Sequence, residues 1–423
     1  MLSYRIFIWL YPKAVALAAF FNPKAKQWIR GREGIFERIQ DELRNCNLPK
    51  IWMHTASLGE FEQGLPVLEQ LRNSYPDHKI VLSFFSPSGY EIRKNHPAAD
   101  HVFYLPMDSP PNARKFLDLV NPRLVLFVKY EFWYYYLNET HQRGIPLLLV
   151  SGIFRKKQAF FRWYGSTYRK MLSFFSVLFV QNRSSAELLA AIGLGKKTVL
   201  AGDTRFDRVL KIAGTFQGIP AIEHFCADKP VIVAGSNWTD DDEELDHFAN
   251  TRQDIRFIIA PHDIGEDRLK ECEKLYRHTV RYTVYAQMLQ DGTLSAARQN
   301  ANVLIIDNMG MLSRLYHYAT IAYVGGGFGE EGIHNILEPA VFGKPVVFGP
   351  VYDKYFEAEE MLAENGAVTV SDALQLESVM ASLLDNPDKL QRTGLAAGSY
   401  VKSRAGATKR IIGYIQANRL LIN

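Results

Sequence analysis

A carboxylate stands beside a glycine in HTASLGEFEQGLPVLEQL, residues 54–71, where an apolar run ends and an amphipathic helix is predicted to begin. Ser57, Gly59 and Glu60 occupy this turn. The helix dipole stabilises a carboxylate there by about 0.3–1 kcal/mol, which explains Glu60 without any catalysis. The alternative is a general base that takes a proton from a hydroxyl, with Gly59 leaving room for the substrate. A helix start is expected to keep Glu60 ionised, so both explanations hold together, and we interpret Glu60 as a catalytic base.

A second candidate site lies in YVGGGFGEEGIHNILEP, residues 323–339. An apolar run ends in three consecutive glycines, and two more glycines precede a helix predicted to start near Asn335. Glycines let the backbone approach a ligand, and the free amides of a helix start suit a phosphate. Glu338 can accept hydrogen bonds from both hydroxyls of a ribose. Asn335 and Glu338 are also spaced as in a capping box. We interpret the stretch as a nucleotide site, with which a cap is compatible.

Seven further polar residues follow predicted strands and are candidates for substrate or donor contacts: Ser86, Ser88, Glu131, Arg155, Arg205, Ser236 and His262. A histidine at a strand's carboxyl end can donate to a phosphate or pack against a base, but a lone histidine is as often structural. Arg205 can reach a phosphate or form a surface ion pair. Glu131 can accept a hydrogen bond from Arg or Lys. Asp240, Asp241 and Asp242 open another predicted helix, and we interpret them as solvated charges rather than metal ligands.

Basic and aromatic residues alternate in SGIFRKKQAFFRWYGSTYRKMLSFF, residues 151–175. Such a pattern is found in segments that bind nucleic acid, in segments that bind a membrane surface and in solvated amphipathic helices. The net charge of the chain is +4, which is too small to argue for nucleic acid by itself. A membrane surface or a phosphorylated lipid is the more economical partner, because the N-terminus is also apolar.

The N-terminus is apolar from Ile6 to Phe21, interrupted once by Pro12 and Lys13. This run is shorter than the ~20 residues that a spanning helix needs. Basic residues follow it, as at membrane surfaces with anionic headgroups: Lys24, Lys26, Arg30 and Arg32. We predict an interfacial or marginally inserted anchor, and whether it spans the membrane or lies on it stays open. A signal peptide and a buried helix are the alternatives.

The length of 423 residues favours two domains, and 47% apolar with 22% charged residues is typical of a globular protein. Three widely spaced cysteines, Cys46, Cys226 and Cys272, suggest neither a disulfide framework nor a metal site. Short apolar runs alternate with helical stretches from residue 49 to about 210, and again after residue 230, as in βαβ units around parallel sheets.

The predicted fold class is α/β, with two Rossmann-like, doubly wound domains facing a cleft. Ligands of such domains bind at the carboxyl ends of the strands. The predicted parts are a membrane-anchoring helix (1–30), an acceptor domain (31–213), a linker (214–229), a donor domain (230–397) and a C-terminal helix packing back on the first domain (398–423).

Several motifs stand in an order that resembles the 3-deoxy-D-manno-octulosonic acid (Kdo) transferases of lipopolysaccharide assembly. They are HTASLGEFEQGLPVL, SPSGYE, YEFW, GDTRFD, AGS, IIDNMGML and GIHNILEPAVFGKPVVFGP, and the resemblance covers nearly the whole chain. It implies a two-Rossmann-domain (GT-B) glycosyltransferase that uses CMP-Kdo as donor and a lipid A precursor (lipid IVA) as acceptor. It also implies a location at the cytoplasmic face of the inner membrane. Neither nucleic acid nor a cofactor is expected.

By this resemblance, Glu60 is the general base. The donor contacts would come from Arg205, Ser236, His262, the Asp307-Asn308-Met309-Gly310 turn, Asn335 and Glu338. Ser57, Gly59, Ser86, Ser88, Glu131 and Arg155 are the expected acceptor contacts. A single base opposite the leaving group implies inversion at the anomeric carbon, through a transition state like an oxocarbenium ion. A monophosphate leaving group makes a metal dispensable, and none is expected.

Two other classes compete with this interpretation. A nucleotide-sugar epimerase or hydrolase on the same scaffold would need no lipid acceptor, and the apolar N-terminus argues against it. A two-lobed solute receptor would need a cleavable signal peptide and has no use for a nucleotide site. The number of Kdo residues transferred, the exact acceptor and the oligomeric state are left open by the sequence.

Overall fold

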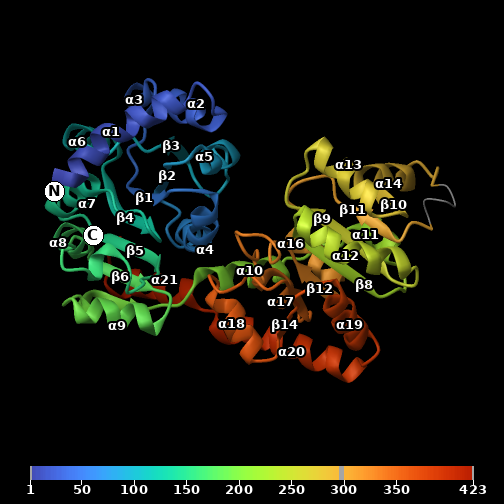
Figure 1. Ribbon diagram of the computed structural model, residues 1–423. Coiled ribbons are helices and arrows are strands. Elements are labelled where there is room, and N and C mark those ends of the chain that lie inside the picture. Colours follow the sequence, from blue (N-terminus) through green and yellow to red (C-terminus); the bar gives the residue numbers. More distant parts are fainter. Residues whose placement is uncertain (1, 295–299, 422–423) are drawn as a thin grey trace. The chain divides into compact units, whose positions relative to one another are not determined.

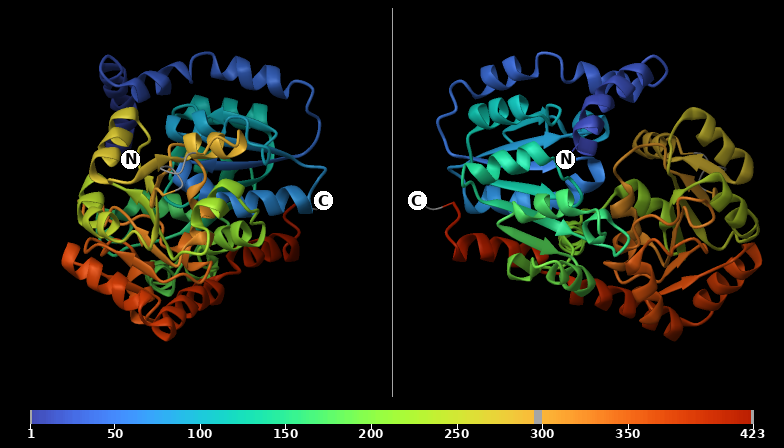
Figure 2. Two further views of the ribbon diagram at one scale, coloured as in Figure 1. Left: turned by 90° about the vertical axis from the view of Figure 1, so that its right-hand side faces the viewer. Right: turned by 60° about the vertical axis from the view of Figure 1, so that its left-hand side comes forward.

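The computed structural model describes residues 2–294 and 300–421, which fold into two compact units. Unit 1 comprises Met1–Arg208 and Ala405–Asn423, and unit 2 comprises Val209–Arg404. Within the described residues, each unit contains a seven-stranded sheet in which all neighbouring strands pair in parallel. Helices lie on both sides of each sheet (Figures 1 and 2).

The sheet of unit 1 has the strand order β3-β2-β1-β4-β5-β6-β7. Its strands are β1 (Lys50–Thr55), β2 (Lys79–Phe84), β3 (His101–Tyr104), β4 (Pro122–Val128), β5 (Leu147–Gly152), β6 (Val177–Val180) and β7 (Thr198–Leu200). Its helices are α1 (Leu2–Ala18), α2 (Pro23–Arg30), α3 (Ile35–Leu43), α4 (Leu58–Ser74), α5 (Pro87–Arg93), α6 (Pro110–Val120), α7 (Tyr134–Gln142), η1 (Ala159–Phe161), α8 (Ser166–Ser173), α9 (Arg183–Ala191), η2 (Gly195–Lys197), α10 (Thr204–Gly214, which continues into unit 2) and α21 (Ala407–Ala417).

The sheet of unit 2 has the order β10-β11-β9-β8-β12-β13-β14. Its strands are β8 (Val231–Asn237), β9 (Arg256–Pro261), β10 (Thr279–Arg281), β11 (Val303–Ile305), β12 (Ile321–Val324), β13 (Val346–Phe348) and β14 (Ala367–Thr369). Its helices are α11 (Pro220–Cys226), α12 (Thr239–Thr251), α13 (Glu266–Leu275), α14 (Tyr282–Gln290), α16 (Leu312–Leu315), η3 (Tyr316–Tyr318), α17 (Leu337–Ala340), α18 (Phe356–Ala363), α19 (Ala373–Leu384) and α20 (Pro387–Arg404).

Alternating side chains of the strands in unit 1 enter two separate apolar cores, because successive residues of a strand point to opposite faces. Trp52 of β1 packs into the core that contains side chains of α3, α6 and α7. Met53, the next residue, packs into the core formed with α4 and α21. Apolar side chains dominate the cores on both faces of the sheet, which is why these strands read as continuous apolar runs rather than alternating ones.

In each sheet, the chain first adds strands on one side of its first strand and then continues on the other side. The place where this happens is called the switch point, and ligands bind there in such sheets. In unit 1 the chain winds outward from β1 to β3 and then returns to β4 on the other side of β1. In unit 2 the same reversal separates β8 from β12. Loops at the carboxyl ends of two strands diverge at such a switch point and leave a crevice. The candidate ligand-binding loops are therefore those after β1 and β4 in unit 1, and after β8 and β12 in unit 2.

The expectation of two parallel α/β domains is confirmed, with strands in both regions, from residue 49 to about 210 and after residue 230, where alternating apolar runs predicted them. The short edge strand β10 was not predicted. The chain passes between the units at Arg208/Val209 and at Arg404/Ala405, whereas we expected boundaries at 213 and 397. The segment 214–229, expected to be a linker, contains helix α11, because Ile222 and Phe225 are buried there. In the expected C-terminal part, α20 stays in unit 2 and α21 packs on unit 1.

The expected N-terminal anchor is a helical segment of unit 1 that is partly packed and partly exposed. Helix α1 contains Pro12, and Trp28 of α2 is buried. Tyr4 packs against one core of the unit, whereas Phe20 and Phe21, just after α1, are 82% and 89% exposed. No helix in the described part of the chain is both long enough and apolar enough to cross a membrane.

Candidate active site

Glu60 lies in the first turn of α4, directly after β1 at the switch point of unit 1. Its Oε2 accepts a hydrogen bond of 2.7 Å from the backbone N–H of Ala56. Burial and the negative charge of Glu131 raise the pKa of Glu60 to about 7, against the opposing effects of Ala56, Lys129 and the Ser57 amide. We expected the helix start to keep Glu60 ionised. Desolvation and repulsion by Glu131 instead outweigh the amides, so that the pKa lies near neutrality.

Glu131 follows β4, the other strand of the switch point, and is held by buried aromatic residues. Its Oε2 accepts a hydrogen bond from Nε1 of Trp133 and lies 3.3 Å from Nε2 of His54. His54 is fully buried, and its Nδ1 lies 2.9 Å from Oγ of Ser83. We expected Arg or Lys as the partner of Glu131. The structure instead places a network of His and Trp side chains there, which orients the carboxylate.

In each unit, one residue other than glycine adopts left-handed backbone close to a loop of the switch point. Lys129, two residues before Glu131, has a φ of 65°, and Ser236 in unit 2 has a φ of 59°. This left-handed region is sparsely populated by residues other than glycine. Strained backbone of this kind persists where the surroundings impose it, often at binding sites.

The predicted acceptor residues of the first two loops lie together. The backbone N–H of Ser86 donates to the carbonyl of Ala56, so the loop after β2 runs beside the loop after β1. Oγ of Ser86 caps α5 by accepting from the N–H of Ser88. Gly59 is exposed, and a Cβ built on it would meet no atom within 4 Å. Together with Ser57 and Glu60, these residues form one surface at the carboxyl ends of β1 and β2.

Arg155 and Glu131 line a cavity of about 910 Å³ in unit 1. Aromatic side chains form most of its wall, including Tyr130 and Phe132. Burial raises the pKa of Tyr130, Arg155 opposes this effect and Glu60 adds to it. The charges of Arg155 and Glu60 thus act on one phenol at the edge of this cavity. Sequence reasoning identified both charged residues but not the cavity that lies beside them.

In unit 2, Ser236 lies near the end of β8, and His262 directly follows β9 and belongs to a stack of three rings. His262 stacks on Trp238, with centroids 4.4 Å apart, and on His334, with centroids 4.6 Å apart. Nε1 of Trp238 donates to Nε2 of His334 over 3.4 Å. Burial, and then the charge of His262, lower the pKa of His334 to about 4, so this ring is neutral at pH 7. Trp238 and His334 were not predicted as site residues.

Three glycines of the predicted nucleotide loop are required by the protein's own backbone rather than by a ligand. A Cβ on Gly325 would lie 2.7 Å from Cα of Asn237, at the end of β8. A Cβ on Gly327 would lie 2.5 Å from the amide nitrogen of Gly349. Gly326 has a φ of 91°, which other residues rarely adopt. Loops of unit 2 therefore account for these glycines by themselves, and the approach of a ligand to this segment stays a prediction.

Asn335 and Glu338 lie at a very short helix. Helix α17 has four residues, and Oδ1 of Asn335 accepts from the N–H of Leu337. Nδ2 of Asn335 donates to Oε1 of Glu338 over 3.1 Å. The helix that we expected to start near Asn335 and to hold a phosphate is a single turn, so its dipole is small. Both side chains are partly buried and lie close to the stacked rings through the neighbouring His334.

The predicted Asp307–Gly310 turn follows β11, and hydrogen bonds fix the position of its first residue. Asp307 accepts hydrogen bonds from the N–H and the hydroxyl of Thr283. Met309 is 74% exposed, and Gly310 has a φ of 87°. Oδ1 of Asn308 is buried without a hydrogen-bond partner. The turn presents exposed backbone, and the structure shows no contact that assigns it to a ligand.

Arg205 belongs to unit 1 and forms an ion pair there. Its guanidinium contacts Oδ2 of Asp203 at 2.8 Å. The same GDTRFD motif has structural functions, because Asp207 accepts hydrogen bonds from the N–H groups of Gly406 and Thr408 at the start of α21. A role for Arg205 at the donor phosphate stays a prediction.

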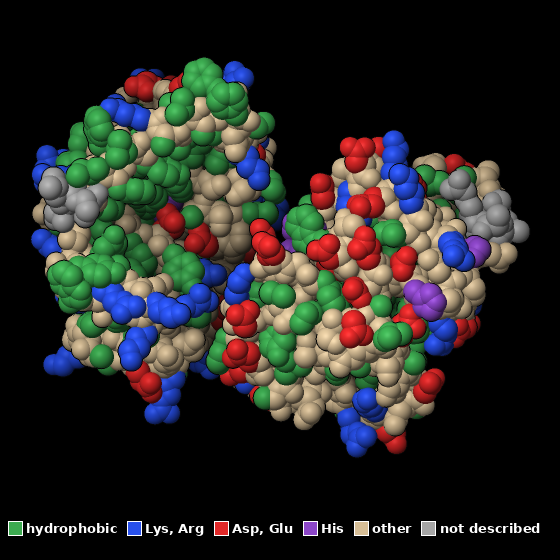
Figure 3. Space-filling view, viewed as in Figure 1, with side chains coloured by type: hydrophobic (Ala, Val, Ile, Leu, Met, Phe, Trp, Pro, Cys, Tyr) green, Lys and Arg blue, Asp and Glu red, His purple; other side chains and the backbone are tan. Residues whose placement is uncertain are grey.

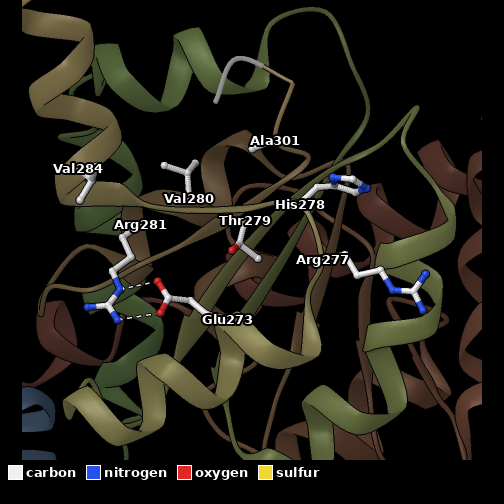
Figure 4. Close-up of a pocket in the computed structure, with 8 residues that line it drawn as sticks. All are labelled: Glu273, Arg277, His278, Thr279, Val280, Arg281, Val284 and Ala301. Atoms are coloured by element: carbon white, nitrogen blue, oxygen red, sulfur yellow. Dashed lines mark hydrogen bonds and ion pairs between the residues drawn. The ribbon is translucent and has the colours of Figure 1, made fainter. Parts of the chain in front are cut away.

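A second pocket, of about 490 Å³, lies beside β10 in unit 2 and contains none of the predicted site residues (Figure 4). Figure 4 shows Arg281 and Glu273 pointing toward each other there. Arg281 also pairs with Glu266, so its charge is already neutralised. In residues 2–294 and 300–421, no group of three or more His, Cys, Asp or Glu side chains is placed to hold a metal ion. That no metal is needed stays a prediction.

Solved structures show which fold this architecture shares. UDP-GlcNAc 2-epimerase from Neisseria meningitidis superposes with a TM-score of 0.61 over 87% of this chain and 100% of that chain, at 16% identity. MurG of Acinetobacter baumannii superposes with a TM-score of 0.53 over 87% of this chain and 99% of that chain, at 14% identity. Identities this low show the fold alone. The fold consists of two parallel-sheet α/β domains, as in GT-B glycosyltransferases.

Sequence comparison shows which glycosyltransferases the chain is similar to. Residues 29–208 match the family model of the 3-deoxy-D-manno-octulosonic-acid transferases (kdotransferases). The 3-deoxy-D-manno-octulosonic acid transferase of Haemophilus influenzae is 26% identical over 95% of this chain and 94% of its own length. The transferase of the same name from Aquifex aeolicus is 28% identical over 82% of this chain and 88% of its own. The chain is a glycosyltransferase. Its unit 1 carries the Kdo transferase domain, and the resemblance to these enzymes extends over most of its length.

Proposed function

We propose that the protein transfers Kdo from CMP-Kdo to a lipid A precursor, such as lipid IVA, in lipopolysaccharide assembly. The observation that carries this proposal is the position and pKa of Glu60. It stands at the switch point of a Kdo transferase domain, with a pKa of about 7. A general base is most efficient when its pKa lies near the working pH.

In the proposed reaction, the oxygen of a sugar hydroxyl forms a bond to the anomeric carbon of Kdo. The bond from that carbon to the phosphate oxygen breaks, and CMP leaves with the bonding electron pair. The hydroxyl proton passes to the carboxylate of Glu60 as the new bond forms. Glu131 keeps a second negative charge close to Glu60, which stabilises the protonated product state of the base. One base without a covalent intermediate gives inversion at the anomeric carbon.

We assign the donor to unit 2, where the three stacked rings and the Asn335–Glu338 pair adjoin the switch point. Neutral His334 and the exposed edge of Trp238 offer a flat aromatic surface for a cytosine ring, while Glu338 suits the ribose hydroxyls. A contact of Arg205 with the donor phosphate is part of this proposal, in addition to its ion pair with Asp203. No cofactor is proposed.

We also propose that the protein works at the cytoplasmic face of the inner membrane, where its acceptor resides. Exposed apolar side chains at the N-terminus support this proposal: Trp9, Leu17, Phe20 and Phe21. Lys24, Lys26 and Arg30 follow them in the sequence. Apolar side chains bury into the acyl region of a bilayer, and basic residues attract anionic headgroups.

CMP release from CMP-Kdo, measured with and without a lipid A precursor, tests this function. The proposal expects release that depends on the acceptor, together with an acceptor product heavier by one or more Kdo residues. Equal release without acceptor would indicate a hydrolase. Conversion of the nucleotide sugar to an isomer without CMP release would indicate an epimerase. Either of these outcomes would contradict the transferase.

A further inference from the structure

The cavity of about 910 Å³ in unit 1 combines an aromatic wall with the carboxylate of Glu131. Aromatic side chains come from three separate segments: Tyr4 and Phe7 of α1, Tyr130 and Phe132 after β4, and Phe160 and Tyr168 around α8. Its volume lies within the range of about 300–1,000 Å³ that is typical of small-molecule sites. Glu131 lines the same cavity, so a ligand inside it reaches the neighbourhood of the proposed base.

Helix α1 is fixed to the domain at this point. The hydroxyl of Tyr4 donates to Oδ2 of the buried Asp108 and accepts from the backbone N–H of Tyr134. The rings of Tyr4 and Tyr134 also lie 6.1 Å apart. Phe7, one turn further along α1, lines the cavity and is 47% exposed. The start of α1 is therefore a wall of the cavity, whereas its far end is not part of it.

The polar groups at the cavity identify the chemistry of its occupant. Arg155 and Lys157 line it together with Glu131, and Lys156 is exposed beside them. Figure 3 shows hydrophobic side chains around a hollow on unit 1, with acidic side chains inside it and Lys and Arg side chains along its lower border. A ligand that complements this surface has an apolar chain, an anionic group and a hydroxyl.

We propose that the cavity binds an acyl chain of the acceptor, so that α1 is part of the acceptor site rather than only a membrane anchor. The aromatic wall holds the chain, while Arg155 and Lys157 contact an anionic group of the headgroup. The acceptor hydroxyl is then directed toward Glu60 and Glu131. This inference rests on the proposed function for the identity of the acceptor.

Kinetics with a detergent-solubilised acceptor test the inference, with two alanine variants of the full chain. Phe7→Ala removes a cavity side chain, and Leu374→Ala removes an apolar side chain of unit 2 that lies outside the cavity and is 81% exposed. We expect Phe7→Ala to raise the KM for the acylated acceptor about 10-fold, because a phenyl group loses its apolar contact. Leu374→Ala should keep the wild-type KM. Both variants should keep the wild-type KM for CMP-Kdo.

The fully deacylated acceptor completes the experiment. We expect the wild type to use it with a kcat/KM at least about 10-fold lower, since no chain fills the cavity. Phe7→Ala should then make no further difference. Equal use of both acceptors by the wild type, or an equal effect of Phe7→Ala and Leu374→Ala, would overturn the inference.

Calorimetric binding of the acylated acceptor without CMP-Kdo separates the inference from the proposed function. Binding that Phe7→Ala weakens, without any CMP release in the complete reaction, would refute the transferase activity and retain the acyl site. Acceptor-dependent CMP release without any effect of Phe7→Ala on binding or KM would retain the transferase and refute the acyl site. Unchanged thermal unfolding of Phe7→Ala would show that the variant is folded.

Discussion

Glu60 combines two features that a general base needs, a fixed position and a pKa near neutrality. The Ala56 amide fixes one carboxylate oxygen, and burial with the charge of Glu131 raises the pKa to about 7. The raised pKa also has a cost for folding. The unfolded chain releases this proton near its ordinary pKa of 4.5, so stability contributed by protonated Glu60 falls as pH rises from about 4.5 to about 7.

Replacing Glu60 by Gln is expected to lower kcat by about 10²–10⁴-fold, because the amide can accept the Ala56 hydrogen bond but cannot accept the substrate proton. For the wild type, kcat/KM should rise with pH and level off above about 7, as Glu60 loses its proton. The variant should lack this step. Turnover of Glu60→Gln at the wild-type rate would refute the assignment, provided that binding of CMP confirms an intact unit 2.

Replacing Glu131 by Gln is expected to move the acidic limb of the pH profile to lower pH. The negative charge of Glu131 raises the pKa of Glu60, so its removal leaves burial as the main remaining cause of the shift. The pH midpoint of kcat/KM measures this effect even where the absolute rate is low. Glu187→Gln is the matched control, since Glu187 is 68% exposed and is not among the charges that act on Glu60. An unchanged midpoint in Glu131→Gln would show that the two carboxylates are not coupled.

At the scale of elements, the parallel strands determine which predicted residues meet. Apolar runs predict the strands, and Glu60 and Glu131 are visible after two of them. Their proximity depends on β1 pairing directly with β4, a strand more than sixty residues further along the chain. The network through His54 and Ser83 was hidden for a related reason. Both residues look like ordinary strand interior, and only the β1–β2 register places them side by side.

Other features were missed because short-range patterns do not contain them. Strand β10 has three residues at a sheet edge, where apolar runs are weak. The aromatic cavity is assembled from α1, the segment after β4 and α8, which are distant in sequence. In the sequence, the glycines at 325–327 suggested a ligand. The structure gives a second reason for glycine here, because a Cβ on Gly325 would collide with Asn237 and a Cβ on Gly327 with Gly349.

Gly59→Ala tests whether Gly59 of α4 leaves room for the acceptor to approach Glu60. A Cβ at this position meets no atom within 4 Å, so the fold tolerates it. Alanine is a better helix former by about 1 kcal/mol, so the variant should unfold at an equal or higher denaturant concentration. We expect its KM for the acceptor to rise, because the added methyl group stands where the sugar approaches Glu60. A stable variant with wild-type KM would show that Gly59 has no part in acceptor binding.

At the scale of the whole molecule, the chain leaves unit 1 in α10 and returns to it before α21. Ile411, Ile412 and Ile415 of α21 complete one apolar core of unit 1, and Asp207 binds the amides at its start. The last residues of the chain are thus part of the domain formed by the first. The expected boundary at 397 falls inside α20. The sequence does not show the true division, because α20 and α21 are both helical and differ in the unit against which each packs.

Membrane association belongs to the whole molecule, and its test should spare the packed part of the N-terminus. Deleting residues 1–22 would also remove the Tyr4–Asp108 contact and the Asn22 cap of α2. Replacing both Phe20 and Phe21 by Asp leaves these contacts and removes the most exposed aromatic residues of the segment. We expect sedimentation with anionic lipid vesicles to fall by about 10-fold or more, because each phenyl group contributes apolar contact with the acyl region.

Leu374→Asp is the control for this prediction, because Leu374 is a similarly exposed apolar residue, at 81%, in unit 2. It should sediment with vesicles as the wild type does. Added salt should weaken the binding of all three proteins, since Lys24, Lys26 and Arg30 attract the anionic headgroups. CMP affinity should be equal in all three. If the double variant sedimented like the wild type, the apolar N-terminus would not be the membrane contact, and the basic segment at 155–170 would be the next surface to substitute.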